Sequence, residues 1–352
     1  MIIYFLESEI CKKNTGFEYI FNAYLKAENL SKKIITIRSK LDLSLGSYGI
    51  LGLPFVLSNA YLLLLYKNLF KINVNEEKSI IIGSSNNLYV IYSIIFKINN
   101  YYMVDSLYDY YSKKLKNKLI KKIILSLIFY LELYISQNIN GLIFLNSRIS
   151  TRKFNFRYRK FSKAKKARCL PIGLSISNFH KGVQNEKFTP IKDIGIYANF
   201  GFYENFEGIK KILDFFKDYK KKVNIHIAGP GSKQFDCIKV SNYVKLISYG
   251  YVEDLGCWMD ALDCQILPAI ESNGVKIKLL ELIYYNKPVF VLNEVYKHLL
   301  PAKSKIFANV YNADGFDELN LFLDKNNYIS SINNIDILSW DNHIKILNES
   351  LR

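Results

Sequence analysis

Several features that would place the chain in a familiar class are missing from its sequence. The five cysteines are scattered and form no Cys-x-x-Cys pair, which favours reduced thiols over a disulfide framework or a zinc site. The four histidines are not spaced as metal ligands, so we expect ordinary surface or core residues. No Gly-x-Gly-x-x-Gly follows a strand-like run, which argues against a nicotinamide-dependent oxidoreductase.

Targeting and membrane-spanning segments are not evident either. The first residues, MIIYFLESEI, lack a basic region and meet acidic side chains at once, so they predict a buried strand rather than a secretory signal. Residues 50–66 are apolar, but Gly52 and Pro54 interrupt them, and residues 111–135 begin with six lysines among ten residues. We expect no transmembrane span. For both segments, a helix on a membrane surface and an ordinary buried helix remain open.

The formal charge of +17 is unevenly distributed along the chain. Residues 1–185 contain 28 Lys and Arg against 10 Asp and Glu, a charge of +18, whereas residues 186–352 contain 20 against 21, a charge of −1. Half of the residues are hydrophobic, which excludes a disordered chain and allows a sizeable core. This division favours two domains, of which only the first faces an anionic surface.

One basic segment, residues 148–168, has the composition of a nucleic-acid surface. It contains ten Lys and Arg, with Phe154, Phe156, Tyr158 and Phe161 among them. No recognised nucleic-acid module surrounds it, so we expect anionic lipid or a phosphate-bearing ligand instead, and nucleic acid stays an alternative.

Strand-like and helix-like segments alternate along both halves of the chain. Residues 204–222, for example, predict an amphipathic helix in which Ile209, Leu213 and Phe216 recur at helical spacing. This alternation predicts parallel β-α-β units, and therefore an α/β fold with two doubly wound, Rossmann-like sheets. The predicted strands begin near residues 2, 33, 78, 101 and 140 in the first half, and near 193, 223, 242, 264 and 287 in the second.

A break in the pattern separates the two halves. The segment CLPIGLSISNFH ends the first series of strands, and KGVQNEKFTP has the composition of a linker. We therefore predict a domain at residues 1–180 and a second at 181–335. Residues 336–352 form a predicted helical segment that is able to pack back on the first domain.

Residues 267–294 combine charges of both signs with a strand, a loop and a helix. Ligands of open parallel sheets bind at the carboxyl ends of strands, where loops and helix N-termini meet. Gly274 permits close approach of the backbone, and the helix start attracts phosphate. Lys276 and Lys278 add cationic donors, and the Glu281 carboxylate suits a ribose diol. A diphosphate with sugars at both ends would explain both signs of charge.

The stretch contains a second acidic residue and also has a simpler interpretation. Glu271, before the turn, is placed to face the rest of such a ligand. The alternative interpretation is a solvated helix in which Lys278 and Glu281 pair at i,i+3 spacing.

The segment GVKIKLLELIYYNKPVFVL resembles the donor-binding motif of GT-B glycosyltransferases, particularly family 4, also called group 1. Other segments match that family in order: INNYYMVDSLYDYYS, LPIGLSISNFH, GIYANFGFYENFEGIKKIL, VNIHIAGPGS and YVKLISYGYVEDLGCWMDALDCQILPAI. The resemblance is good over residues 168–295 and diffuse before them. It implies a GT-B fold, in which the C-terminal domain takes a nucleotide-sugar donor and the N-terminal domain takes the acceptor.

The resemblance also implies roles for individual residues. Lys276 and Lys278 would hold the diphosphate and Glu281 the ribose, with no metal and no cofactor, in agreement with the absence of an Asp-x-Asp motif. The donor would be a UDP- or GDP-sugar. The candidate catalytic residues are Asp105 and Glu271, although Asp105 also fits a helix N-cap. The candidate donor-binding residues are Gly16, Gly229, Gly274, Val275, Lys276, Lys278 and Glu281.

The chain departs from the family at the donor site. The first acid of the family's Glu-x7-Glu pair would fall at Asn273, and Glu271 lies two residues earlier. Phe200 and Glu207 stand near the places of the family's Arg and Lys, so phosphate binding would depend on Lys276 and Lys278.

We therefore predict a cytoplasmic glycosyltransferase at the inner face of the cytoplasmic membrane. It would build bacterial surface polysaccharide (capsule, O-antigen or lipopolysaccharide) on a lipid-linked acceptor, with its basic first domain on the anionic membrane. The alternative is a non-catalytic membrane- or partner-binding module with a GT-B fold.

Overall fold

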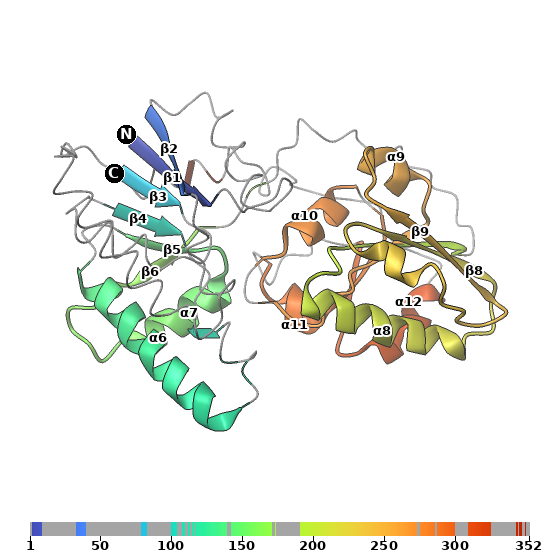
Figure 1. The fold of residues 1–352 in the computed structure, drawn as a ribbon, viewed down its shortest axis with the longest axis horizontal. Helices are drawn as coiled ribbons and strands as arrows, with labels where there is room; N and C mark the ends of the chain where they lie inside the picture. Colours follow the sequence, from blue (N-terminus) through green and yellow to red (C-terminus); the bar gives the residue numbers. More distant parts are fainter. Residues whose placement is uncertain are drawn as a thin grey trace. The chain divides into compact units, whose positions relative to one another are not determined.

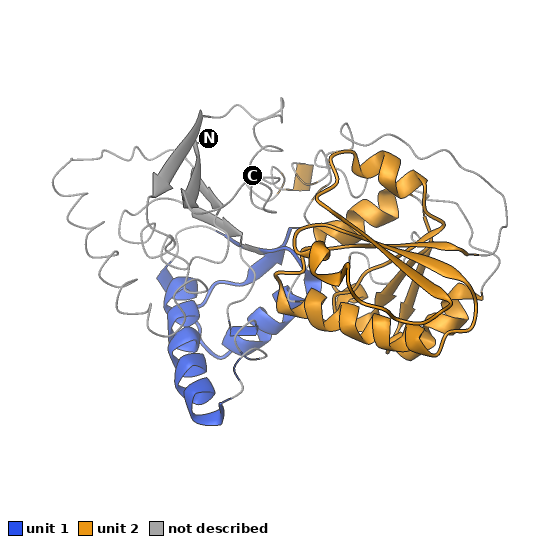
Figure 2. Cartoon of the chain, turned by 45° about the vertical axis from the view of Figure 1, so that its right-hand side comes forward, with its two compact units in different colours: residues 1–171 blue, residues 172–352 orange. Residues whose placement is uncertain are grey.

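The computed structural model divides the chain into two compact units, residues 1–171 and 172–352 (Figure 2). Each unit is considered by itself below. The structure describes the backbone of four strands in residues 2–103, then most of the chain from residue 117 to 324, and a few isolated positions. Its continuous described ranges after the first four strands are 117–138, 142–170, 191–272, 275–285, 287–299 and 309–324.

The first unit contains a six-stranded sheet in the order β2-β1-β3-β4-β5-β6, and every neighbouring pair is parallel. Five of these strands were predicted. The sixth was missed because the sequence of β6, Ala-Arg-Cys, is short and lies among basic residues. The strands are β1 (Ile2–Ser8), β2 (Lys33–Ser39), β3 (Ser79–Ile82), β4 (Asn100–Met103), β5 (Ile143–Leu145) and β6 (Ala167–Cys169).

Two helices of the first unit are described, α6 (Lys118–Asn138) and α7 (Arg148–Tyr158) (Figure 1). The Ser147 side chain caps α7 by accepting a hydrogen bond from the Ser150 amide at 3.5 Å. Phe154 and Tyr158, two of the aromatic residues in the basic segment, are buried in the core of the unit. These two rings therefore cannot stack on the bases of a nucleic acid.

The second unit contains another six-stranded parallel sheet, in the order β12-β11-β10-β7-β8-β9. The chain runs outward from β7 through β8 to β9, then returns to the other side of β7 and continues through β10 to β12. This is the order of a Rossmann fold. The strands are β7 (Asp193–Tyr197), β8 (Val223–Ala228), β9 (Val244–Gly250), β10 (Cys264–Ile266), β11 (Val289–Leu292) and β12 (Val310–Ala313).

The helices of the second unit use both faces of this sheet. The long helix α8 buries Ile209, Leu213 and Phe216, the residues whose helical spacing predicted it, in one cluster with Ile194 and Ile196 of β7. The short helix α12 shares that core, whereas α9 and α10 contact the opposite face of β7. The helices are α8 (Tyr203–Lys217), α9 (Leu255–Asp260), α10 (Ile277–Tyr284), α11 (Asn293–Tyr296) and α12 (Leu319–Leu323), with 3-10 turns at Ser232–Phe235 and Phe316–Glu318.

The predicted α/β class with two parallel sheets is therefore confirmed. The strands β7 to β11 lie where the sequence placed them, and β12 was not predicted. We predicted the domain boundary after residue 180, and the two compact units of the structure divide nine residues earlier, after Pro171. The predicted linker, residues 181–190, and most of residues 336–352 lie outside the described residues.

Candidate functional site

The strand order of the second unit marks one place for a ligand. β7 and β10 are neighbours whose connections leave in opposite directions, and such a switch point opens a crevice outside their carboxyl ends. The two segments at this point are residues 198–202, after β7, and residues 267–276, after β10. The second of these segments is the one whose mixed charges predicted a binding site.

Close backbone packing shapes the loop after β7. The Ala198 amide donates to the Ala228 carbonyl at 3.1 Å, and the Phe200 amide donates to the Pro230 carbonyl at 2.9 Å. Gly229 adopts a φ of 110°, and a Cβ there would lie 2.1 Å from the Ala198 oxygen. The structure thus gives Gly229, a predicted donor-binding residue, a reason to be glycine that is independent of any ligand.

Helix α8 packs directly on the loop after β10. A Cβ on Gly208 would lie 1.5 Å from the Pro268 carbonyl oxygen, so the helix and the loop touch through their backbones. The Ile270 amide also donates to the Glu204 carbonyl at 3.3 Å. These contacts bring the first turn of α8 against the segment that carries the predicted site.

An ion pair joins the two sides of the switch point. The Lys276 ammonium lies 3.1 Å from a carboxylate oxygen of Glu204, and both side chains are half-buried. Lys276 is a predicted phosphate ligand, whereas sequence reasoning missed Glu204. Its signal was available, because Glu204 is the acidic residue in the first turn of a helix that directly follows a strand.

Lys278 lies in a different environment from Lys276. Its ammonium group is 3.3 Å from the centroid of the Tyr197 ring, between α10 and the face of β7 that does not pack against α8. Burial lowers the pKa of Lys278 to about 8, although the nearby Glu281 carboxylate acts in the other direction. Of the two predicted phosphate ligands, Lys276 is therefore the one that lies in the loop at the switch point.

Glu281, the predicted ribose ligand, faces the same buried layer as Lys278. Burial raises the pKa of Glu281, and Lys278 opposes this shift. No ion pair within 4 Å joins the two described side chains, although they attract each other. The alternative of a solvated helix with a Lys278–Glu281 pair therefore does not describe α10.

Aromatic side chains extend this polar layer across the sheet. The Trp258 ring lies 6.3 Å from that of Tyr197 and 6.1 Å from that of Tyr249. His226 stacks on Tyr249 at 5.8 Å, bonds its hydroxyl through Nδ1 at 2.8 Å, and approaches Asp193 through Nε2 at 2.9 Å. The Asp193 carboxylate also accepts from Asn224 at 2.8 Å. His226 is therefore a hydrogen-bonded structural residue.

The remaining predicted residues divide into two groups. Glu271 and Val275 are half-buried and flank the site in the described part of the loop. Gly16, Asp105 and Gly274 lie outside the described residues, as does Asn273.

The two departures from the family pattern have visible consequences. Phe200 is buried and packs edge-on against Phe235 at 5.1 Å between ring centroids. Glu207 forms an ion pair with Lys210 at 2.8 Å on the same helix. An apolar and an acidic side chain therefore occupy positions near which the family carries cations.

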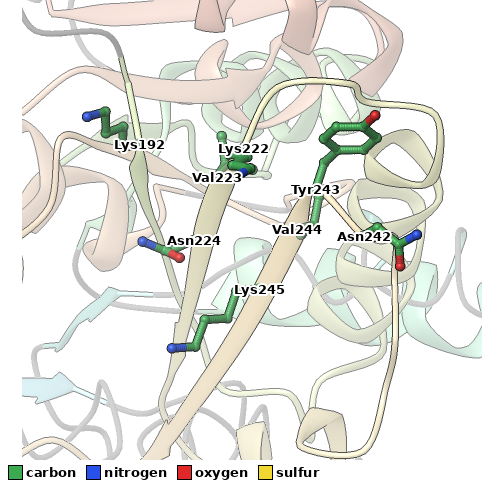
Figure 3. A pocket seen from close by; sticks show the side chains of 8 residues that line it. All are labelled: Lys192, Lys222, Val223, Asn224, Asn242, Tyr243, Val244 and Lys245. Atoms are coloured by element: carbon green, nitrogen blue, oxygen red, sulfur yellow. The ribbon is translucent and has the colours of Figure 1, made fainter.

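A shallow groove lies at the other end of the same sheet, where β8 and β9 begin (Figure 3). Its volume is about 410 Å³, and lysines and asparagines provide most of its polar groups. Because it lies at the amino ends of the strands, it is separate from the switch point. Its lining residues are Lys192, Lys222, Val223, Asn224, Asn242, Tyr243, Val244 and Lys245.

Among the residues that the structure describes, no group of three His, Cys, Asp or Glu side chains is arranged to hold a metal ion. The same residues contain no helix that is both long enough and apolar enough to cross a bilayer.

Comparison with known proteins connects this site with a family. Residues 192–316 match the family model described as glycosyl transferases group 1. The match begins just before β7 and includes both loops of the switch point. It confirms the resemblance predicted for this part of the chain. No curated protein sequence matches the chain significantly.

Solved structures resemble the whole chain at low sequence identity. The apo form of the lipopolysaccharide outer core galactosyltransferase WaaB is 15% identical, with a TM-score of 0.66 over 100% of this chain and 99% of that one. Anabaena HepE in complex with UDP-glucose is 13% identical, with a TM-score of 0.66 and the same coverage. A glycosyltransferase from Rickettsia africae is 15% identical, with a TM-score of 0.54 over 99% and 92%. These likenesses confirm the predicted GT-B fold.

Proposed function

We propose that this chain is a glycosyltransferase that binds a nucleotide-sugar at the switch point of its second unit and transfers the sugar to a glycan. The observation that carries this proposal is the match of residues 192–316 to the group 1 glycosyl transferases. The matched residues include the ion-paired Lys276 and Glu204 at the carboxyl ends of β7 and β10.

The donor in this proposal is a UDP-sugar, with a GDP-sugar as the second choice. HepE, which shares the fold, was solved with UDP-glucose. Lys276 and the amides at the start of α10 would hold the diphosphate, since a helix N-terminus and an ammonium group both favour negative charge. Glu281 would accept hydrogen bonds from the ribose, and Glu271 would face the transferred sugar.

Transfer requires an acceptor hydroxyl to attack the anomeric carbon of the sugar. A new carbon–oxygen bond forms as the bond to the diphosphate breaks, and the hydroxyl proton passes to a base, for which we propose Asp105. The leaving diphosphate gains negative charge, which Lys276 and the α10 amides would stabilise. We propose that no metal ion takes part, because the sequence lacks an Asp-x-Asp motif.

The proposed acceptor is a lipid-linked glycan of a bacterial surface polysaccharide, used at the inner face of the cytoplasmic membrane. The charge of +18 over residues 1–185 supports this part of the proposal, since an anionic leaflet attracts lysine and arginine by about 1 kcal/mol per residue near the surface. WaaB, one of the similar structures, is a lipopolysaccharide enzyme by its name.

Thermal unfolding of the full chain with UDP, GDP, ADP, CMP and their common sugars tests the donor site. A ligand at about 100 times its dissociation constant adds roughly 2.7 kcal/mol to the free energy of unfolding. We expect a shift with UDP and UDP-sugars that EDTA does not change and that Glu281→Ala abolishes. Asp214→Asn, at the far end of α8 and exposed, serves as the control. No shift with any nucleotide would contradict the proposal.

A non-catalytic module with the same fold is the second candidate. Phe200 and Glu207 favour it, because both positions lack the family's cation. Release of free sugar from a UDP-sugar by the wild-type chain, lost in Glu281→Ala, would exclude this candidate. Nucleotide binding without any hydrolysis or transfer would support it.

A further inference from the structure

Helix α6 carries an apolar surface on the side that faces solvent. Six large apolar or aromatic residues of this helix are exposed, among them Leu119 at 69%, Tyr130 at 67% and Ile123 at 54%. An α-helix turns by about 100° per residue, which places all six within an arc of about 100°. The exposed residues, called here the α6 stripe, are Leu119, Ile120, Ile123, Leu127, Tyr130 and Tyr134.

The opposite side of α6 is firmly attached to the first unit. Glu132 accepts hydrogen bonds from the Tyr158 hydroxyl at 2.8 Å, from Arg157 at 3.2 Å and from the Tyr108 amide at 3.1 Å. Arg157 also pairs with Asp109 at 2.5 Å. Leu133 belongs to the same buried cluster as Tyr158. The helix therefore cannot rotate to bury the α6 stripe without breaking this network.

Basic residues accompany the α6 stripe. Lys118, Lys121 and Lys122 occupy the first two turns of α6, and no carboxylate among the described residues forms an ion pair with them. Three more lysines, at positions 113, 114 and 116, precede the helix in the sequence. At the other end of the stripe, Tyr130 and Tyr134 combine an apolar ring with a polar hydroxyl, as in residues found at membrane interfaces.

We infer that the α6 stripe is a membrane-docking surface, which inserts into the interface of a bilayer that contains anionic lipid. The helix lies along the membrane, because its described length and polarity do not allow it to cross. Lysines at its N-terminal end bind the negative headgroups, and the aliphatic residues enter the acyl boundary. This chemistry favours lipid over a second protein, since six lysines among ten residues match an anionic leaflet.

The inference specifies the membrane partner of the proposed function, but binding to lipid does not require catalytic activity. It also decides between the two interpretations of residues 111–135 that the sequence left open. The helix is neither simply buried nor simply solvated, because one side joins the core and the other exposes the α6 stripe.

Sedimentation of the full chain with vesicles tests the inference. The vesicles contain either phosphatidylcholine alone or phosphatidylcholine with about 30% phosphatidylglycerol, which gives their surface the negative charge that attracts lysine and arginine. The variant Ile123→Ser/Leu127→Ser removes two exposed aliphatic side chains from the stripe. The matched control, Ile238→Ser/Leu321→Ser, removes the same two residue types from exposed positions of the second unit. Thermal unfolding and the UDP-induced shift are measured for every variant.

We expect the wild type and the control to bind anionic vesicles equally, and the stripe variant to bind at least about tenfold more weakly. Replacing Lys118, Lys121 and Lys122 by Gln should weaken binding at low salt more than at high salt. Equal binding by the stripe variant, or no binding by the wild type, would overturn the inference. So would a dimer of the wild type that the stripe variant loses while neither binds vesicles, since a second copy would then cover the stripe. If the stripe variant loses vesicle binding but keeps the UDP-induced shift in thermal unfolding, its donor site is intact. The result of the vesicle assay is then independent of whether the proposed function is correct.

Discussion

The ion pair between Glu204 and Lys276 makes a specific prediction about donor affinity. Glu204 places a carboxylate 3.1 Å from the lysine that we assign to the diphosphate. In the free protein this carboxylate satisfies Lys276, but in the complex it would stand beside a ligand of the same sign. We therefore predict that Glu204→Gln binds UDP more tightly than the wild type does.

The magnitude follows from Coulomb's law. Two like charges about 6 Å apart repel by roughly 3 kcal/mol at an effective dielectric constant of about 20, and by less than 1 kcal/mol in water. Both side chains are half-buried, so we expect a gain on the order of 1–2 kcal/mol. That gain corresponds to a dissociation constant about 5–30 times lower.

Isothermal titration calorimetry of UDP and a UDP-sugar at low and moderate salt measures this effect. Lys276→Met should weaken both ligands, and Asp214→Asn, which breaks an exposed ion pair farther along α8, should leave both unchanged. The gain in Glu204→Gln should decrease as salt increases. Weaker UDP binding in Glu204→Gln would refute the reasoning. Weaker binding of the UDP-sugar alone would instead show that Glu204 bonds the sugar.

Three further predictions concern folding, each measured by urea unfolding. Lys278→Met should raise the free energy of unfolding at pH 7 by about 1–2 kcal/mol, because the folded state lowers the pKa of this lysine to about 8 and so disfavours its charged form. The wild type gains stability as the pH rises from 8 to 10.5, so the difference between variant and wild type should vanish above pH 10.5. A difference that persists above pH 10.5 would contradict this cause. Gly208→Ala should cost about 2–3 kcal/mol of unfolding free energy, because its Cβ would lie 1.5 Å from the Pro268 carbonyl oxygen. Gly201→Ala should cost less, because its Cβ would meet only a side chain, at 3.1 Å. Equal costs for the two variants would refute the backbone contact at Gly208. Glu132→Gln should cost about 2–3 kcal/mol, because it removes one of the two carboxylate charges that the half-buried Arg157 pairs with, the other being that of Asp109. An unchanged stability would show that the network is dispensable.

Periodicity in the sequence was sufficient for most elements of the fold. Helix α8 was predictable because Ile209, Leu213 and Phe216 recur on one side, and β11 because VFVL is a short apolar run between turn residues. The alternation of such elements then required parallel sheets. β6 and β12 escaped prediction because their sequences, ARC and VYNA, are short and lack the apolar alternation of a strand.

The candidate site was predictable only in part. A strand, a loop with glycine and a basic helix start indicated a phosphate site at residues 267–276 without knowledge of the fold. The same letters named both Lys276 and Lys278 as phosphate ligands. Only the tertiary structure distinguishes the two lysines, since the Lys278 side chain packs on the Tyr197 ring.

The sequence by itself determined the elements, their alternation and the charge of each half, because these depend on residues close together along the chain. Tertiary structure decided which strands became neighbours, and therefore that the crevice opens between β7 and β10. It also brought Glu204 to Lys276 across 72 positions and left the α6 stripe on the outside. Such outcomes depend on contacts between distant residues, whose geometry no local pattern records.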